Sequence, residues 1–330
     1  GYNTDFFGMQ ALLLREKMEL AGGKVLILGS GGTSHTAEAV AKSLGAASII
    51  NVSRESREGA VTYEEAYAIH SDVNFLINTT PCGMYPNIEG VPLDIERFKG
   101  LKGVADAIYN PLCSELVLRA RKKGIIATGG LFMLVAQAVR ASELFFDTKY
   151  EDSLIESIYR NIESKKGNIV LTGMPGSGKS TVGKYVAVAT DKSFVDTDEL
   201  IVKKAGMEIA DIFKKYGEPY FRDMESEVIK ELSLQTGLLI STGGGAVLRE
   251  SNVWELKRNG KIYFINRPLE NIIPTDDRPL SDNEEKLAGL YKERLPIYMK
   301  TADAVVDANA DVDKVVHRLI EGRLYENYSY

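Results

Sequence analysis

Two glycine-rich turns, each lying between an apolar strand and a helix, restrict the folds open to this chain. The first turn follows residues 24–28 and the second follows residues 168–171. Further apolar strands are expected at 48–52, 75–78, 103–107, 238–241, 261–265 and 304–306. Strands that alternate with helices are typical of parallel sheets covered by helices on both faces. The sequence therefore predicts an α/β fold with one sheet around each turn.

The length of the chain favours two domains. At 330 residues it exceeds what one core of ordinary size contains. We place the boundary in the polar segment 147–168, where a helix is expected over 151–162 and a linker over 163–167. The predicted domains are residues 1–163 and residues 164–330.

Charge and cysteine content argue against several classes of function. A formal net charge of -6 argues against nucleic acid as the main partner, because nucleic-acid-binding proteins usually carry a basic face. No apolar run reaches the ~18 residues that a membrane-spanning helix needs. Cys82 and Cys113 lack the spacing of a metal site or a disulfide framework. We expect a cytoplasmic protein that binds neither nucleic acid nor membrane, and the start at Gly1 without a methionine suggests a fragment or a processed piece.

The second turn is a phosphate-binding motif. Residues 173–181 read GMPGSGKST, which fits G-x-x-x-x-G-K-[ST] between a strand and a helical run over 182–189. Backbone N–H groups of such a loop surround polyphosphate oxygens, and the following helix adds the positive end of its dipole. Lys179 would reach the β- and γ-phosphates, and Ser180 would ligate Mg²⁺. The nucleotide-binding residues predicted here are Gly173, Pro175, Gly176, Ser177, Gly178, Lys179, Ser180 and Thr181.

Three further groups follow the phosphate loop. Asp196 and Asp198 stand two residues apart at the expected end of a strand, hence on one face of the sheet, where open α/β sheets bind ligands. Arg222 and Glu225 share a helix face. Three glycines at 243–245 directly follow an apolar strand and suit a close backbone approach to a ligand. Each group also has a plain alternative, namely a solvated acidic turn, a surface ion pair and an ordinary turn.

Together with Arg294 in RLPIY and Arg278 in DRPL, these motifs resemble shikimate kinase over residues 167 to about 324. The resemblance implies a P-loop kinase with a lid that uses ATP and Mg²⁺ to convert shikimate to shikimate 3-phosphate, a step of aromatic amino acid biosynthesis. Asp198 would hold the acceptor hydroxyl and act as its base, and Asp196 would serve Mg²⁺.

The same resemblance assigns the substrate contacts. Arg222 and Arg294 would bind the substrate carboxylate, which suits the planar guanidinium. The substrate would be lined by Gly243, Gly244 and Gly245. Arg278 would stabilise charge on the transferred phosphoryl group.

One departure concerns the lid. The family usually carries another arginine several residues before R-P-L, whereas residues 273–277 here are short and acidic, and Arg267 is the nearest alternative cation. Two other functions stay open: a kinase for another small carboxylated polyol, and a nucleotide-sensing or scaffold module without turnover.

The first turn is of the dinucleotide-binding kind. Residues 29–34 read GSGGTS, so that serine replaces the third glycine of G-x-G-x-x-G. The next strand ends at Ser53 and Arg54. An arginine at this position suits the 2′-phosphate of NADP, whereas an acidic residue would favour NAD. The alternative for Arg54 is a solvated loop charge.

Segments 1–5, 78–84, 106–111 and 130–137 resemble the nicotinamide domain of shikimate dehydrogenase, a Rossmann-like fold. By this resemblance Asp5 is the acid/base partner at the reacting hydroxyl, and Tyr109 and Gln137 reach shikimate. NADP would be held or bordered by Gly29, Gly31, Gly32, Thr33, Ser53, Arg54, Thr79 and Met133.

The dehydrogenase family also has a preceding substrate domain that supplies a catalytic lysine. This chain does not contain that domain, so a separate chain or a missing segment would have to supply it. Hydride transfer requires the substrate carbon to be held against the nicotinamide. We therefore expect negligible dehydrogenase turnover from this chain alone, with NADP binding retained.

Overall fold

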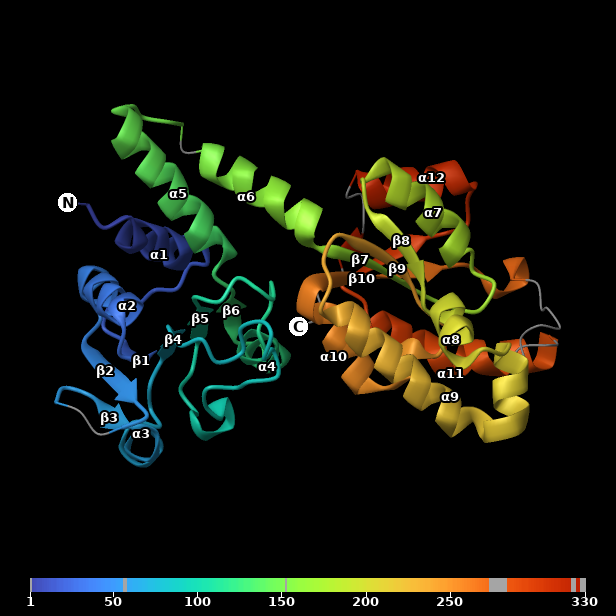
Figure 1. The fold of residues 1–330 in the computed structure, drawn as a ribbon, viewed down its shortest axis with the longest axis horizontal. Helices are drawn as coiled ribbons and strands as arrows, with labels where there is room; N and C mark the ends of the chain where they lie inside the picture. Colours follow the sequence, from blue (N-terminus) through green and yellow to red (C-terminus); the bar gives the residue numbers. More distant parts are fainter. Residues whose placement is uncertain (1, 56–57, 152, 273–283, 322–324, 327–330) are drawn as a thin grey trace. The chain divides into compact units, whose positions relative to one another are not determined.

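The computed structural model describes residues 2–55, 58–151, 153–272, 284–321 and 325–326. The chain divides into two compact units, Gly1–Glu163 and Ser164–Tyr330. Each unit is built on its own six-stranded sheet, blue to green for the first unit and green to red for the second (Figure 1). The predicted α/β fold is confirmed in both. None of the described helices is both long and apolar enough to cross a membrane.

The sheet of the first unit is parallel throughout and has the order β3-β2-β1-β4-β5-β6. This is the strand order of dinucleotide-binding domains, and it reverses direction between β1 and β4. The glycine turn after β1 therefore lies at the switch point. The strands are β1 (Lys24–Leu28), β2 (Ser48–Ser53), β3 (Val61–Thr62), β4 (Phe75–Asn78), β5 (Gly103–Asp106) and β6 (Ile126–Thr128).

Helices cover both faces of this sheet because successive strand residues point to opposite sides. Val25 and Ile27 pack into one buried cluster with residues of α1, α2 and α5, whereas Leu26 and Leu28 pack into another with residues of α4. The helices are α1 (Thr4–Arg15), α2 (Gly32–Ser43), α3 (Tyr63–Ile69), α4 (Glu115–Lys122), α5 (Leu131–Phe146) and α6 (Ser153–Lys166).

The expected linker at 163–167 is wrong in one respect, because α6 continues to Lys166. Glutamate and lysine favour helices, and Lys165 and Lys166 in the last turn complement the negative end of the helix dipole. The ammonium of Lys192 then donates to the carbonyls of Ser164 and Gly167, at 2.7 and 2.6 Å. The chain thus turns directly from α6 into the first strand of the second unit.

The second sheet has the order β12-β11-β10-β7-β9-β8, with β12 antiparallel to β11 and the other pairs parallel. The strand before the phosphate loop, β7, is central and lies between β9 and β10. The strands are β7 (Asn168–Thr172), β8 (Ser193–Asp196), β9 (Leu238–Ser241), β10 (Gly260–Asn266), β11 (Ala304–Asp307) and β12 (Tyr325–Glu326).

Two buried clusters pack against this sheet, and β7 contributes Val170 to one and Leu171 to the other. The helices are α7 (Lys179–Ala189), α8 (Thr197–Ala205), α9 (Ile209–Ser233), α10 (Glu250–Asn259), α11 (Glu284–Thr301) and α12 (Val312–Ile320). Helix α9 is interrupted at Gly217, whose φ of 82° and ψ of 169° are not helical. Such a φ is readily adopted only by glycine.

Candidate active site

The phosphate loop connects β7 to α7. Gly178 ends the loop with a φ of 92° and is the N-cap of α7, and Lys179 is the first residue of the helix. The Lys179 ammonium is buried and donates to the carbonyls of Gly173 and Met174, at 3.0 and 2.9 Å. The lysine thus lies against the loop that would surround a polyphosphate.

A hydroxyl and a carboxylate meet beside this loop. Ser180 Oγ donates to Asp196 Oδ2 at 2.8 Å and lies 3.1 Å from Ser241 Oγ at the end of β9. Among the described residues no group of three or more His, Cys, Asp or Glu side chains could hold a metal ion. Magnesium usually needs only one or two protein oxygens, because water and substrate phosphates complete its coordination. Ser180 and Asp196 therefore fit a phosphate-bound Mg²⁺.

Asp196 and Asp198 come together in a different way from that expected. Asp196 is the last residue of β8 and the N-cap of α8, and its Oδ1 accepts from the backbone N–H of Asp198 at 3.0 Å. Asp198 lies in the first turn of the helix, so the alternation of a strand does not apply to it. Asp196 caps the free N–H groups of α8, a role that suits a short acidic side chain. Because α8 begins directly after β8, both carboxylates lie at the same end of the sheet.

The carboxylate of Asp198 lies in a crowded, negative environment. Its Oδ1 is buried without a hydrogen-bond partner, and it stands only 2.6 Å from the position that a Cβ on Gly243 would occupy. Burial, followed by the charges of Asp196 and Glu225, raises the pKa of Asp198 to about 6. Burial also raises the pKa of Glu225, against the opposing effect of Arg222. A glycine at 243 is required because any side chain would displace Asp198.

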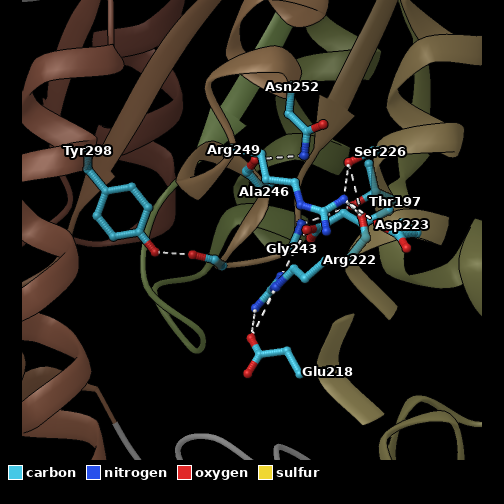
Figure 2. Close-up of polar contacts among 12 residues, drawn as sticks. Thr197, Glu218, Arg222, Asp223, Ser226, Gly243, Ala246, Arg249, Asn252 and Tyr298 are labelled. Carbon is cyan, nitrogen blue, oxygen red and sulfur yellow. Dashed lines mark hydrogen bonds and ion pairs between the residues drawn. The ribbon is translucent and has the colours of Figure 1, made fainter. Parts of the chain in front are cut away.

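Arg222 is held by two carboxylates, and Figure 2 shows one of them, Glu218. Its Nη1 donates to Glu225 Oε2 at 2.9 Å, whereas Nε and Nη2 both donate to Glu218 Oε1, at 3.2 and 3.0 Å. Arg222 and Glu225 are buried, so the alternative of a surface ion pair is wrong. Glu218 is 43% exposed and follows the break at Gly217, which turns it toward the guanidinium.

The backbone near Arg222 is fixed by a second arginine. Arg249 Nη1 donates to the carbonyl of Arg222 at 2.9 Å, to Asp223 Oδ1 at 2.7 Å and to Ser226 Oγ at 3.1 Å (Figure 2). Arg249 stands at the start of α10. It therefore ties α10 to the turn of α9 that presents Arg222.

The three glycines after β9 form one wall of the site. The N–H of Gly243 donates to Thr197 Oγ1 at 2.9 Å, and the carbonyl of Gly244 accepts from the hydroxyl of Tyr298 (Figure 2). A Cβ on Gly245 would lie 2.3 Å from the Arg222 guanidinium. The backbone thus lies directly against the arginine, which excludes the alternative of an ordinary turn.

Unpartnered polar atoms concentrate around this site. Of the ten such buried atoms in the described part of the chain, seven belong to the second unit and stand at or beside the residues just described. Buried polar atoms in proteins are normally hydrogen-bonded, so a cluster of exceptions indicates ligand positions. The seven atoms are Thr172 Oγ1, Ser177 Oγ, Asp198 Oδ1, Glu225 Oε1, Asn266 Oδ1, Arg267 Nε and Arg294 Nε.

Two predicted arginines, Arg278 and Arg294, follow β10 in the chain. Arg294 is buried in α11, and its Nε is one of the unpartnered atoms. Arg278 lies outside the described residues, as does the acidic stretch 273–277. The predicted roles of Arg278 and of that stretch therefore stay predictions.

The glycine turn of the first unit is open on the side where a ligand would bind. A Cβ on Gly31 or Gly32 would meet nothing within 4 Å, whereas Gly29 has a φ of 115° and lies against Thr79. Gly31 is the N-cap of α2 and has no side chain to bind the free N–H groups of the helix. Such a turn fits a pyrophosphate at the helix N-terminus. Thr33 continues α2 beside this opening.

The other predicted cofactor and substrate residues of this unit differ in exposure. Ser53 is buried at the end of β2 and Arg54 is exposed, as a ribose phosphate ligand must be. Met133 is buried in the core between α1 and α5. Tyr109 is exposed.

Asp5 and Gln137 lie on two helices that pack closely. Asp5 is in the first turn of α1, one turn before Gly8, whose missing Cβ would stand 3.0 Å from Gln137 Cβ on α5. The Oε1 atom of Gln137 is buried without a partner. Among the described residues of the first unit it is one of three such atoms, and it leaves an acceptor available for a ligand.

Comparison with known proteins decides the family. The family model for shikimate kinase matches residues 175–322. The shikimate kinase of Clostridium botulinum (strain Eklund 17B / Type B) is 44% identical over 155 residues, which cover 46% of this chain and 93% of that kinase. That of Caldanaerobacter subterraneus subsp. tengcongensis is 44% identical over 161 residues, which cover 47% of this chain and 92% of that kinase.

The chain belongs to the shikimate kinase family. The predicted kinase family is therefore confirmed, and we refer to Ser164–Tyr330 as the kinase unit. The chain is also similar to the solved structure of shikimate dehydrogenase 1 from Peptoclostridium difficile, with 32% identity and a TM-score of 0.46. That match covers 49% of this chain and 62% of the dehydrogenase, so the chain spans less than two thirds of its length.

Several residues of the kinase site were missed from the sequence. Glu218 stands four residues before Arg222, a spacing that allows an ion pair on a helix. The neighbouring Gly217 interrupts α9, so the sequence does not predict that this pair lies on one helix. Ser241, at the end of β9, was readable only as part of a strand. Thr197 and Arg249 carried no signal, because their roles depend on contacts between distant elements.

We expect Asp198→Asn to stabilise the kinase unit above pH 6. The folded state binds the Asp198 proton up to about pH 6 and the unfolded chain only to its ordinary value of 3.8, so stability falls as pH rises through this window. Removing the charge restores up to about 3 kcal/mol, at about 1.4 kcal/mol per pKa unit. Urea unfolding followed by fluorescence of Trp254, the one tryptophan, measures this.

The gain should disappear below about pH 4, where the wild-type carboxyl is protonated in both states. The control is Asp191→Asn, an exposed aspartate that follows α7. An equal gain at pH 4 and pH 8 would contradict the titration of Asp198 as the cause.

Proposed function

We propose that the kinase unit transfers the γ-phosphoryl group of ATP to a hydroxyl of shikimate, giving shikimate 3-phosphate for aromatic amino acid biosynthesis. Membership of the shikimate kinase family supports this proposal. The observation that carries the site assignment is the convergence of Lys179, Asp198 and Arg222 at the carboxyl ends of neighbouring strands, each beside unpartnered polar atoms.

Each residue has a role that follows from its surroundings. Asp198 accepts the proton of the attacking hydroxyl, and its pKa of about 6 keeps it ionised at neutral pH while still a usable base. Lys179 neutralises charge on the β- and γ-phosphates. Arg222 and Arg294 bind the substrate carboxylate with planar donors. When bound, Mg²⁺ at Ser180 and Asp196 would supply charge neutralisation on the phosphates.

Glu218 has a place in the same scheme. Its carboxylate occupies the Nε and Nη2 edge of Arg222, the pair of donors that a substrate carboxylate would use. Because Glu218 is partly exposed and the substrate is also negative, binding would displace it from the arginine. Glu225, which is fully buried, would keep its own bond to Nη1 throughout.

Two other functions compete with this proposal. A kinase for another small carboxylated polyol would use the same phosphate loop, and an acceptor screen that includes gluconate separates it from a shikimate kinase. A nucleotide-sensing module without turnover would bind ATP and release no product. The geometry of Asp198 beside the glycine wall favours catalysis, because a buried unpartnered carboxylate is costly to retain without a use.

Asp198→Asn should abolish most of the turnover. We expect shikimate-dependent ADP release, measured in a coupled assay, to fall by about 10²–10⁴-fold, the usual contribution of a general base. Asp191→Asn is the matched control and should retain wild-type rates. ATP binding by the wild type without shikimate-dependent ADP release would exclude the kinase and support the sensing module.

Arg222→Lys should affect only the acceptor. Lysine keeps the charge but loses the bidentate geometry, so we expect the KM for shikimate to rise at least about tenfold while the KM for ATP stays unchanged. Arg318→Lys, which alters a surface ion pair of the same unit, serves as the control. If Arg222→Lys raises the KM for the carboxamide analogue of shikimate as much as the KM for shikimate, Arg222 does not bind the carboxylate.

We also propose that Gly1–Glu163 binds NADP as the nicotinamide domain of a shikimate dehydrogenase. The strand order, the open turn at Gly31 and Gly32, and the exposed Arg54 after β2 support this. Asp5, Tyr109 and Gln137 would reach shikimate once a substrate domain, on a separate chain or a further segment, completes the pocket.

Cys82 and Cys113 are free thiols, which supports a cytoplasmic location.

Arg54→Gln should weaken NADPH binding and spare NADH. Loss of a charged contact to the 2′-phosphate is expected to raise the Kd for NADPH about tenfold or more, measured by the fluorescence of the bound dinucleotide. Lys99→Gln, an exposed lysine elsewhere in the unit, is the control. Equal loss of both dinucleotides would show that Arg54 does not distinguish them.

A further inference from the structure

Arg267 lies immediately after β10, next to the phosphate loop. Strand β10 pairs with β7 in parallel, with Phe264 opposite Thr172. The residues that follow the two strands therefore run side by side, and the carbonyl of Ile265 stands 2.7 Å from the position of a Cβ on Gly173. The register of the sheet thus brings Arg267 to the loop.

The guanidinium of Arg267 points at the start of α7. Its Nη1 stands 3.6 Å from the position that a Cβ on Gly178 would occupy, and apart from the neighbours of Gly178 in the chain no other described group lies within 4 Å of this position. Gly178 is the N-cap of α7, so its neighbours carry the N–H groups that no helical carbonyl accepts. A phosphate bound to these N–H groups would therefore lie next to the Arg267 guanidinium.

Within the described part of the chain Arg267 has no anionic partner, whereas four other arginines of the kinase unit have one. Arg222, Arg249, Arg258 and Arg318 each form an ion pair with a carboxylate. The Nε of Arg267 is instead buried without a hydrogen bond. A half-buried guanidinium without an anion is costly, and a bound anion would offset that cost.

We propose that Arg267 is a second cation of the nucleotide site and binds the α- and β-phosphates of ATP and ADP. This assignment rests on the proposed kinase function. The amides at the end of a phosphate loop hold the α- and β-phosphates, whereas the loop lysine reaches the β- and γ-phosphates. Arg267 stands over the end of the loop, so its contact survives loss of the γ-phosphate. The planar guanidinium suits phosphate oxygens in pairs.

The test is a titration of the full chain with ADP and with ATP in the absence of shikimate. Arg267→Met should raise both Kd values by about tenfold or more and by equal factors, because the contact is to the shared diphosphate. The Kd values of Arg267→Lys for ADP and ATP should lie between those of the wild type and those of Arg267→Met. The control, Lys261→Met, removes an exposed charge from the same strand at its other end and should leave both Kd values unchanged.

Unfolding followed by Trp254 fluorescence establishes that each variant is folded. Unchanged ADP affinity in folded Arg267→Met would overturn the inference, and a loss confined to ATP would place the contact at the γ-phosphate and overturn the assignment to the diphosphate. Wild-type protein that binds ADP but shows no shikimate-dependent ADP release would refute the proposed kinase while leaving the test of Arg267 intact.

Discussion

The parallel register of β7 with β9 and β10 is the constraint on which the kinase site depends. Parallel strands end at one edge of the sheet, so the residues that follow them are neighbours regardless of their distance in sequence. The phosphate loop after β7, Ser241 and the glycines after β9, and Arg267 after β10 meet for this reason. Asp196 joins them because β8 pairs with β9.

Charge balance in the substrate pocket illustrates how a catalytic site conflicts with stability. Asp198 and Glu225 are carboxylates in a crowded environment, and burial raises the pKa of each. Arg222 compensates Glu225 directly, whereas Asp198 keeps an unpartnered oxygen. A polar group left unpaired costs free energy in the free protein, and that cost is offset only when the substrate binds. The same logic applies to Arg267 at the nucleotide.

Much of the site was predictable because its chemistry is encoded locally. The phosphate loop needs glycines and a lysine at fixed spacing, and the strand before it is a continuous apolar run. The sequence predicts that Asp198 lies beside Asp196, but the reason given, the alternation of side chains along a strand, is wrong. Asp196 is the N-cap of α8, and this helix sets the position of Asp198. The expected linker was also wrong, because residues up to Lys166 have helix propensity that the polar composition concealed.

The sequence by itself determined the two α/β units, the phosphate loop and the identities of the groups that meet there, because hydrophobic periodicity and glycine spacing act over a few residues. Only the tertiary structure decided that the Glu218 carboxylate pairs with Arg222, that Arg249 fixes the backbone of Arg222, and that Arg267 faces Gly178. These contacts join elements far apart in the chain. Their distances depend on sheet register and helix packing, which no local pattern specifies.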